Sequence, residues 1–436
     1  MRKTPFILLF FFGLALAASS QSLEQVLLRL PQSLEWQALD LSFLTASRNF
    51  ESVQAAAGLR VNVGADLNNT TQTTTGVNTT SYKVNASASL PVLPWASQFD
   101  DLRKAERTFE RAKLDLRDSR NTLVVNTSTQ YFNLRIAQLD LELANSTVAL
   151  RQNQLKTALV QRSNNQITPD QLATSQQNLE TAKINVLQAE SSLELAQLTL
   201  ANTLGQTELT IASSAAPVPT LSTTLEAVLK LAFEQRSDIL KSFYTVRDAE
   251  DNLLIAQRDR WLPTTTLSLG VSDSGASLTT GLNLQTGSLS LGGAYQPPAS
   301  TTPSGTTISL SASISIPVIA PSNDARISSS QTALNVAKQN LERSKKSADL
   351  DVRQKFLETQ TALRRIDLSK KALENAKNSL STTQIRVNAG SLTKTDLETS
   401  QLAVQQAERD LENTVLSAYL AWLRLENALG KGLVKV

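Results

Sequence analysis

The chain has 436 residues, enough for two or three ordinary domains, and its 42 Lys and Arg nearly balance its 39 Asp and Glu. It contains no cysteine and no histidine, which excludes disulfides, thiol nucleophiles, histidine-dependent triads and HExxH zinc sites. Charges of both signs are interspersed, and the densest basic run is only Arg343-Ser-Lys-Lys346, so we expect no nucleic-acid partner. We expect neither an enzyme nor a bound cofactor or metal.

Residues 1–17 have the pattern of a secretory signal peptide. The basic start Arg2-Lys3 precedes an apolar stretch from Phe6 to Leu16, and Ala15-Leu16-Ala17 fits a small-x-small cleavage site. The alternative, an uncleaved anchor, is disfavoured because the apolar stretch is short for a spanning helix. No later segment has 18 consecutive apolar residues, so we expect the mature chain to cross a membrane only within a closed barrel.

The chain contains two copies of one unit. Residues 97–205 agree without a gap with residues 322–430, at an offset of 225 positions. Within this alignment Thr174-Ser175-Gln176 meets Thr399-Ser400-Gln401. The alternative is chance similarity among helical sequences, which does not account for gapless agreement over such a length. We therefore expect repeat 1 at 18–220 and repeat 2 at 221–436.

Each copy begins with sequence of strand period, in which every second residue is apolar. We expect strands within about 59–92 of repeat 1 and about 264–318 of repeat 2. The run 308–317 reads ISLSASISIP and is the clearest example. Residues 273–303 contain more alternating sequence, and the pattern leaves open whether they add strands or form an external loop.

The apolar faces of these strands need a partner, either a soluble core or lipid. The runs approach the 9–11 residues of a tilted membrane strand, and their serine-rich faces suit an aqueous lumen. Lipid is the better interpretation in a secreted chain without a spanning helix, and a soluble β-sandwich is the alternative. Because four strands cannot close a barrel around a channel, several chains must contribute.

Each copy continues with a long helical hairpin, at 97–204 and 322–429. Neither 97–163 nor 322–389 contains Gly or Pro, so each segment predicts a helix on the order of 100 Å long. Apolar residues recur every seven positions, which predicts coiled-coil packing: Leu134, Leu141, Val148 and Leu155 in repeat 1, and Ile366, Leu373 and Leu380 in repeat 2.

The sequence also predicts the turn at the tip of each hairpin. In repeat 1, Thr168-Pro169-Asp170-Gln171 has an N-cap, a first-turn proline and a capping-box glutamine. In repeat 2, Thr393 and Asp396 occupy the equivalent positions. Gly390 precedes them where a left-handed residue would end the incoming helix, and Asn165 stands at the same place in repeat 1.

Several motifs occur in a recognisable order. They are Arg236-Ser-Asp-Ile239, Arg258-Asp-Arg-Trp-Leu-Pro263, Ile316-Pro317-Val318, the tip sequence from Arg386 to Leu397, and the closing Leu429-Gly430. In order, spacing and duplication this layout resembles the TolC family of outer-membrane efflux proteins, and the likeness covers nearly the whole mature chain.

The resemblance implies a mainly α fold with a β-barrel portion. Duplicated helical hairpins would form a periplasmic α-barrel, and the strands would contribute to a trimeric outer-membrane β-barrel of twelve strands. The implied location is the outer membrane, with a periplasmic extension. The implied partners are two further copies of the chain, outer-membrane lipid, a periplasmic adaptor (membrane fusion) protein and an inner-membrane transporter.

The resemblance also implies site residues at the tips. Asn165, Gly390, Ser391 and Leu392 would dock the adaptor, and Asp396 and Asp170 would line the periplasmic entrance. The chain departs from the family pattern, since Asn165 replaces the tip glycine of repeat 1, Gln171 matches Asp396, and Thr399 stands at a second acidic position of some members. In the plainer interpretation Gly390 only ends a helix, and Asp396 only complements the helix dipole.

The leading function is a channel that serves as a passive exit duct in a tripartite efflux or type I secretion system. The alternative is a structural coiled-coil spacer that connects the outer membrane to deeper envelope layers. The duplicated hairpin with capped turns favours the duct, because a spacer needs neither the turn nor the second copy. The exported substrate is not encoded here, because in such systems the pump selects it.

Overall fold

The computed structural model describes residues 21–71, 78–206, 218–221, 223–296, 305–315 and 320–433. The predicted signal peptide and the motif Ile316-Pro317-Val318 lie outside the described residues. The chain divides into two compact units, of which unit 1 comprises residues 1–39, 119–229 and 351–436, and unit 2 comprises residues 40–118 and 230–350. Every helix in the described part of the chain is too short or too polar to span a bilayer.

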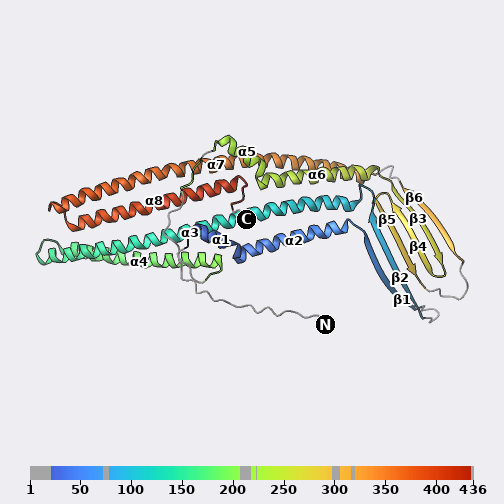
Figure 1. Ribbon diagram of the computed structural model, residues 1–436, viewed down its shortest axis with the longest axis horizontal. Helices are drawn as coiled ribbons and strands as arrows, with labels where there is room; N and C mark the ends of the chain where they lie inside the picture. Colours follow the sequence, from blue (N-terminus) through green and yellow to red (C-terminus); the bar gives the residue numbers. More distant parts are fainter. Residues whose placement is uncertain are drawn as a thin grey trace, which may run out of the picture. The chain divides into compact units, whose positions relative to one another are not determined.

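Unit 2 carries one six-stranded antiparallel sheet in the order β1-β2-β5-β4-β3-β6 (Figure 1). Its strands are β1 (Arg60–Thr71), β2 (Asn78–Pro91), β3 (Thr264–Asp273), β4 (Ala276–Asn283), β5 (Ser288–Tyr295) and β6 (Thr307–Ser315). The segment that the sequence left open therefore adds two strands, β4 and β5, and the count of four strands per chain is wrong. Thr280 in β4 and Gly293 in β5 interrupt the apolar alternation of the added strands, which weakens their sequence pattern.

Four helices of unit 2 pack side by side in the order α2, α3, α6 and α7. Phe43 and Phe50 of α2 (Leu34–Ala56) stack on Phe109 of α3 (Ser97–Ser163), with ring centroids 5.5 and 5.2 Å apart. Arg107 of α3 donates to Asp248 and Asp251 of α6 (Ser237–Trp261), each at 2.6 Å. Helix α6 meets α7 (Pro321–Asn388) through a buried apolar cluster of Val246, Leu334 and Ala337. Two ion pairs cross the same contact, Arg260 with Asp324 and Arg326 with Asp259.

Unit 1 holds the rest of the helices, and its described elements include α1 (Leu23–Arg29), the 3-10 turn η1 (Leu30–Gln32), α4 (Pro169–Leu204), the start of α5 (Leu225–Gln235) and α8 (Lys394–Ala428). One buried cluster joins Leu134 of α3 to Leu200 of α4 and to Leu416 of α8. Helix α8 also meets α7, where the Thr359 hydroxyl donates to the carbonyl of Ala421 at 3.1 Å. The long helices of unit 1 therefore pack in the order α4, α3, α8 and α7.

The predicted heptad positions face these contacts. Leu134 and Ile366 are fully buried, and the other five positions are half-buried. Half-burial at these positions is typical of a single layer of helices, since each helix has neighbours on only two sides. The seven-residue pattern therefore predicted the packing stripe of both hairpins.

Both hairpin turns have the predicted geometry. Asn165 and Gly390 adopt left-handed conformations, with φ values of 56° and 74°. Thr168 and Gln171 form a reciprocal capping box at the start of α4, and Thr393 and Asp396 form the same box at the start of α8. Each turn is therefore fixed locally, by one left-handed residue and one capping box.

We predict that Gly390→Val lowers the free energy of unfolding by about 1–2 kcal/mol, because an L-residue resists the left-handed conformation. A Cβ at Gly390 would meet no atom within 4 Å, so the cost comes from the backbone alone. Gly390→Asn is the matched control, because Asn165 already holds the equivalent conformation. Thermal unfolding followed by circular dichroism checks this, and equal destabilisation by Val and Asn would contradict it.

Candidate functional site

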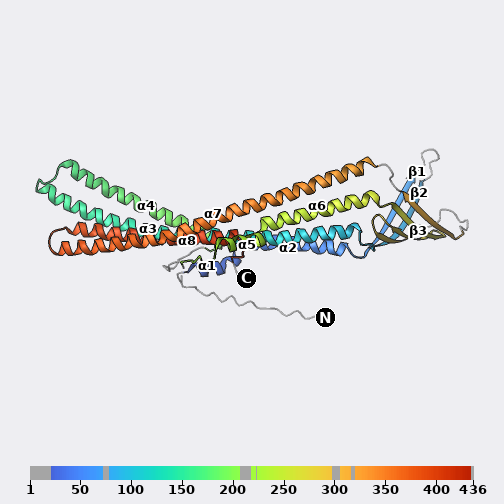
Figure 2. The same cartoon turned by 90° about the horizontal axis from the view of Figure 1, so that it is seen from above.

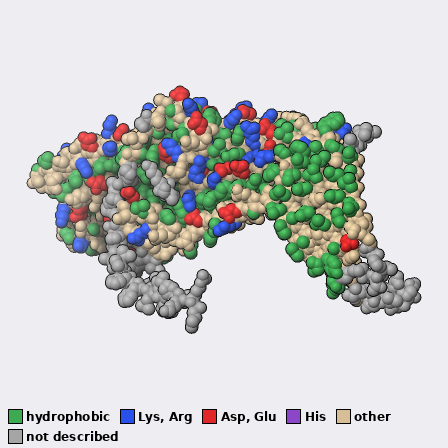
Figure 3. Space-filling view, turned by 45° about the vertical axis from the view of Figure 1, so that its right-hand side comes forward, with side chains coloured by type: hydrophobic (Ala, Val, Ile, Leu, Met, Phe, Trp, Pro, Cys, Tyr) green, Lys and Arg blue, Asp and Glu red, His purple; other side chains and the backbone are tan. Residues whose placement is uncertain are grey.

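The sheet of unit 2 exposes one continuous apolar face. Its register places apolar residues opposite one another across all six strands, for example Val84 beside Tyr295 and Val271 beside both Leu278 and Ile308. These side chains are unusually exposed, with Leu67 76% and Leu310 72% accessible. Figure 3 shows hydrophobic side chains gathered over the strands. An exposed apolar patch of this extent indicates a lipid or protein partner.

The opposite face of the same sheet is polar but nearly uncharged. Serine, threonine, asparagine and glycine occupy most of its positions, and the hydroxyls of Ser268 and Ser311 lie 2.6 Å apart across two strands. Its charged positions among the described strands are Arg60, Asp66 and Lys83, of which the last two are direct cross-strand neighbours. A sheet with one lipid-like and one water-like face is typical of a membrane barrel wall.

Aromatic residues mark both ends of the apolar face, a feature that the sequence interpretation missed. Tyr82 and Tyr295 lie toward the end of the sheet that is farther from the helices of unit 2. Trp261 precedes β3 at the other end and is 77% exposed. Trp95 lies at that same end, where its indole Nε1 donates to the carbonyl of Leu284 at 2.9 Å. Tyr and Trp at the two ends of an apolar face are typical of the aromatic girdles that flank a membrane-embedded band.

The two helical tips lie at the same end of unit 1, in both views (Figures 1 and 2). Asn165, Gly390 and Ser391 are exposed there, and Leu392 is half-buried. The Ser391 hydroxyl donates to the carbonyl of Arg386 at 3.0 Å, so it also holds the turn. The structure thus brings the four residues of the predicted docking tip to one exposed end of the unit.

The predicted entrance acids occupy first-turn positions. The Asp396 carboxylate accepts hydrogen bonds from the Thr393 hydroxyl at 2.7 Å and from the Thr393 N–H at 2.8 Å, and these bonds lower the pKa of Asp396. Asp170 lies in the first turn of α4 and is exposed, as is Asp396. The capping role of Asp396 is thereby confirmed, and an entrance role for either acid stays a prediction.

A ladder of polar contacts joins α3 to α8 below the tips. Arg409 pairs with Asp140 at 2.7 Å, and this hydrogen bond raises the pKa of the Arg409 guanidinium. Arg135 pairs with Glu412 at 2.6 Å. Nearer the tips, the Asn153 amide donates to the Glu398 carboxylate at 3.0 Å. The sequence interpretation missed these contacts, because each joins residues that are 245 or more positions apart.

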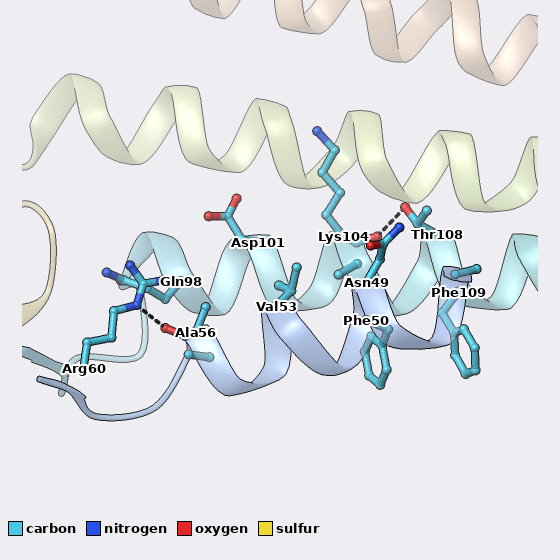
Figure 4. Close-up of a pocket in the computed structure, with 13 residues that line it drawn as sticks. Asn49, Phe50, Val53, Ala56, Arg60, Gln98, Asp101, Lys104, Thr108 and Phe109 are labelled. Carbon is cyan, nitrogen blue, oxygen red and sulfur yellow. Dashed lines mark hydrogen bonds between the residues drawn. The ribbon is translucent and has the colours of Figure 1, made fainter. Parts of the chain in front are cut away.

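Unit 2 also contains a groove of about 510 Å³ between α2 and α3 (Figure 4). Phe50 and Phe109 point to the same side of this helix pair, and Val53 lies between the two helices. Arg60, Asp101 and Lys104 are the charged residues that line it. The groove is open and mostly apolar, which suits a packed side chain better than a polar substrate.

Comparison with known proteins identifies the fold and the family. A family model described as outer membrane efflux protein matches residues 30–206 and 228–431. Among curated proteins, none matches the sequence significantly.

Three solved structures share the fold. The channel CusC has a TM-score of 0.70 at 15% identity, over 94% of this chain and 92% of that chain. The outer membrane protein VceC from Vibrio cholerae has a TM-score of 0.67 at 16% identity, over 94% of this chain and 97% of that chain. The outer membrane channel MtrE from Neisseria gonorrhoeae, solved in its open state, has a TM-score of 0.69 at 17% identity, over 94% of this chain and 89% of that chain.

These findings confirm the resemblance to TolC-like channels and the expected fold of long helical hairpins with a barrel-forming sheet. The family is one of channels and not of enzymes, and its place is the outer membrane, with a periplasmic extension. The two matched stretches fall in the two copies of the duplicated sequence. This chain belongs to the outer membrane efflux protein family.

Proposed function

We propose that the protein is the passive exit duct of a tripartite export system, through which substrate passes from the helical tips to the outside of the outer membrane. One observation supports this most directly. The same chain carries a sheet with a lipid-like and a water-like face and long helices that end in paired, exposed turns. A periplasmic adaptor would dock at Asn165, Gly390, Ser391 and Leu392, and an inner-membrane transporter would supply substrate.

The proposed assembly is a homotrimer, with the number three taken from the resemblance to the family. Both outer helices of the unit 1 layer leave large apolar side chains exposed, which supports contact between copies. They are Ile184, Leu187, Leu195 and Leu198 on α4, and Leu357, Leu368 and Ile385 on α7. In unit 2 the apolar groove beside α2 would receive exposed residues of α7 from the next copy, such as Leu350.

Unitary currents in planar bilayers are the expected result for the purified full-length protein, because a closed assembly with a polar inner face conducts ions. The spacer alternative predicts an assembled protein without currents. The measurement is single-channel recording on a sample whose mass has been determined beforehand. Reproducible absence of current from an intact assembly would reject the duct.

A double change, Leu187→Glu with Leu195→Glu, should convert the trimer in detergent to smaller species, because it places charges in an apolar contact. Both leucines lie on the exposed stripe of α4 and are outside the buried cluster that joins α4 to α3 and α8. Ser192→Glu, on another exposed face of α4, is the control. Native mass measurement decides, and a wild-type protein that is monomeric with full β content would contradict the assembly.

The proposed entrance role of Asp396 can be separated from its capping role by using the other copy as a template. Asp396→Gln reproduces the capping box that Gln171 makes with Thr168 and removes the charge. In a trimer three Asp396 carboxylates would lie around one axis and attract cations. We therefore expect Asp396→Gln to weaken block by a trivalent cation added at the tip side and to raise anion permeability.

The pH dependence follows from the lowered pKa of Asp396, which is below the ordinary value of 3.8. The carboxylate is ionised throughout the neutral range, so cation block should be constant there and weaken as pH falls below 3.8 through the lowered pKa. The ionised Asp396 carboxylate also stabilises the fold. This stabilisation is present above the ordinary pKa and is lost as pH falls through the lowered pKa. Equal block and selectivity in wild type and Asp396→Gln at neutral pH would leave Asp396 as a helix cap only.

A further inference from the structure

The hairpin made of β4 and β5 lies in the middle of the sheet, and this position determines what it can do. Strand β5 pairs with β2 from Val84–Tyr295 to Pro91–Ser288, and β4 pairs with β3 from Thr266–Asn283 to Asp273–Ala276. The hairpin thereby separates β2 from β3, the strands that end repeat 1 and begin repeat 2 of the sheet. A hairpin hydrogen-bonded on both sides is part of the wall and not an external loop.

The hairpin also continues both faces of the sheet. Leu289 and Leu291 of β5 lie opposite Leu90 and Ala88 of β2, so the apolar face passes across the junction without a break. On the other face, Ser290 lies opposite Ser89. Leu291 is 49% exposed, comparable to the apolar residues of the neighbouring strands. The added strands therefore present the same lipid-like and water-like faces as the strands that flank them.

The hairpin extends from one aromatic girdle to the other. The turn between β4 and β5 lies at the junction with the helices. There the Gly287 carbonyl accepts hydrogen bonds from the Val92 N–H at 2.9 Å and from the Leu93 N–H at 3.1 Å. Gly287 has a φ of 66°, and a Cβ there would lie 3.0 Å from the Ala96 backbone, so the close approach requires glycine. At the other end of the hairpin, Tyr295 lies opposite Val84 of β2, in the aromatic girdle that is farther from the helices.

We propose that the inserted hairpin widens the outer-membrane opening, so that a trimer is closed by eighteen strands instead of the twelve that the family resemblance implies. This inference rests on the proposed trimeric duct. Each chain contributes six alternating antiparallel strands, so β6 of one copy and β1 of the next also meet antiparallel and closure is regular.

The widened opening suits bulky solutes of either charge or of none. Barrel diameter grows roughly linearly with strand number, so eighteen strands give about 1.5 times the diameter of twelve. The polar-face residues that β4 and β5 add are serine, threonine, glycine, alanine and asparagine. The hairpin therefore adds circumference without adding charge, and the added wall does not select ions by sign.

The first test uses single cysteines, which report without interference because the natural chain has none. Ser290→Cys and Leu291→Cys probe the two faces of β5, and Ser311→Cys and Leu310→Cys are the matched pair on β6. Each variant is reconstituted in liposomes and treated with a membrane-impermeant maleimide. We expect labelling at 290 and 311 and protection at 291 and 310, with all four labelled after denaturation.

The outcomes separate the inference from the proposed function. Labelling of 290 and 291 alike, with 311 and 310 still different, would place the hairpin outside the wall and overturn the inference. Loss of the difference on β6 as well would overturn the membrane-embedded sheet on which the proposed duct depends.

The second test removes the hairpin by deleting residues 274–295. Residues 296–306 then connect β3 directly to β6, and the ends of these two strands are already close, because the Thr306 hydroxyl donates to the Asp273 carboxylate at 3.2 Å. The deletion lets β2 and β3 meet antiparallel, as the alternation of strands requires. Neutral polyethylene glycols added on the strand side of a planar bilayer should be excluded at a smaller size than in wild type. An unchanged size limit in a trimeric deletion variant would overturn the inference, and the labelling test decides if the variant does not assemble.

Discussion

The structure depends on the requirement that backbone N–H and C=O groups in lipid be hydrogen-bonded within the protein. The four central strands of the sheet are hydrogen-bonded on both sides. The strands β1 and β6 each have a neighbour on one side only, so their outer backbone groups can pair with another copy of the chain. Those two edges face a membrane environment on the apolar side, as the exposed rows of Val63 and Leu310 indicate. A single copy is therefore an incomplete wall, and the same incompleteness recurs in the helical layers, whose outer helices expose leucine and isoleucine.

The two kinds of wall use different interactions for the same purpose. In the sheet, backbone hydrogen bonds set the register, and side chains only have to suit lipid or water. In the helical layers each helix satisfies its own backbone, so side chains alone hold neighbours together. This explains why ion pairs join α3 to α8, Arg135 with Glu412 and Asp140 with Arg409, whereas strand contacts carry few charges. Partly exposed ion pairs contribute modest stability, but they fix which residues of two long helices lie side by side.

The sequence predicted those features that a short stretch of chain determines by itself. The left-handed residues Asn165 and Gly390, the capping boxes and the two unbroken helices depend on neighbours within a few residues, and each was found where expected. Strands β1, β2, β3 and β6 were visible because strict alternation is a strong signal. Strands β4 and β5 were ambiguous because Gly281, Gly292 and Gly293 stand where apolar or polar side chains would mark a face. The α3–α8 ion pairs could not be foreseen, because they depend on the register of helices far apart in sequence.

The alternation of strand directions has a consequence for how such a wall can change over evolutionary time. A single added strand would leave two neighbours running in the same direction, and the loops at both ends would no longer reach their strands. Only a hairpin, which leaves and returns on the same side, preserves the order. Because every copy inherits the same gene, a ring of three identical chains grows by six strands at once. Pore width in such an assembly therefore changes in discrete increments, and one inserted hairpin per chain enlarges it by one increment of six strands.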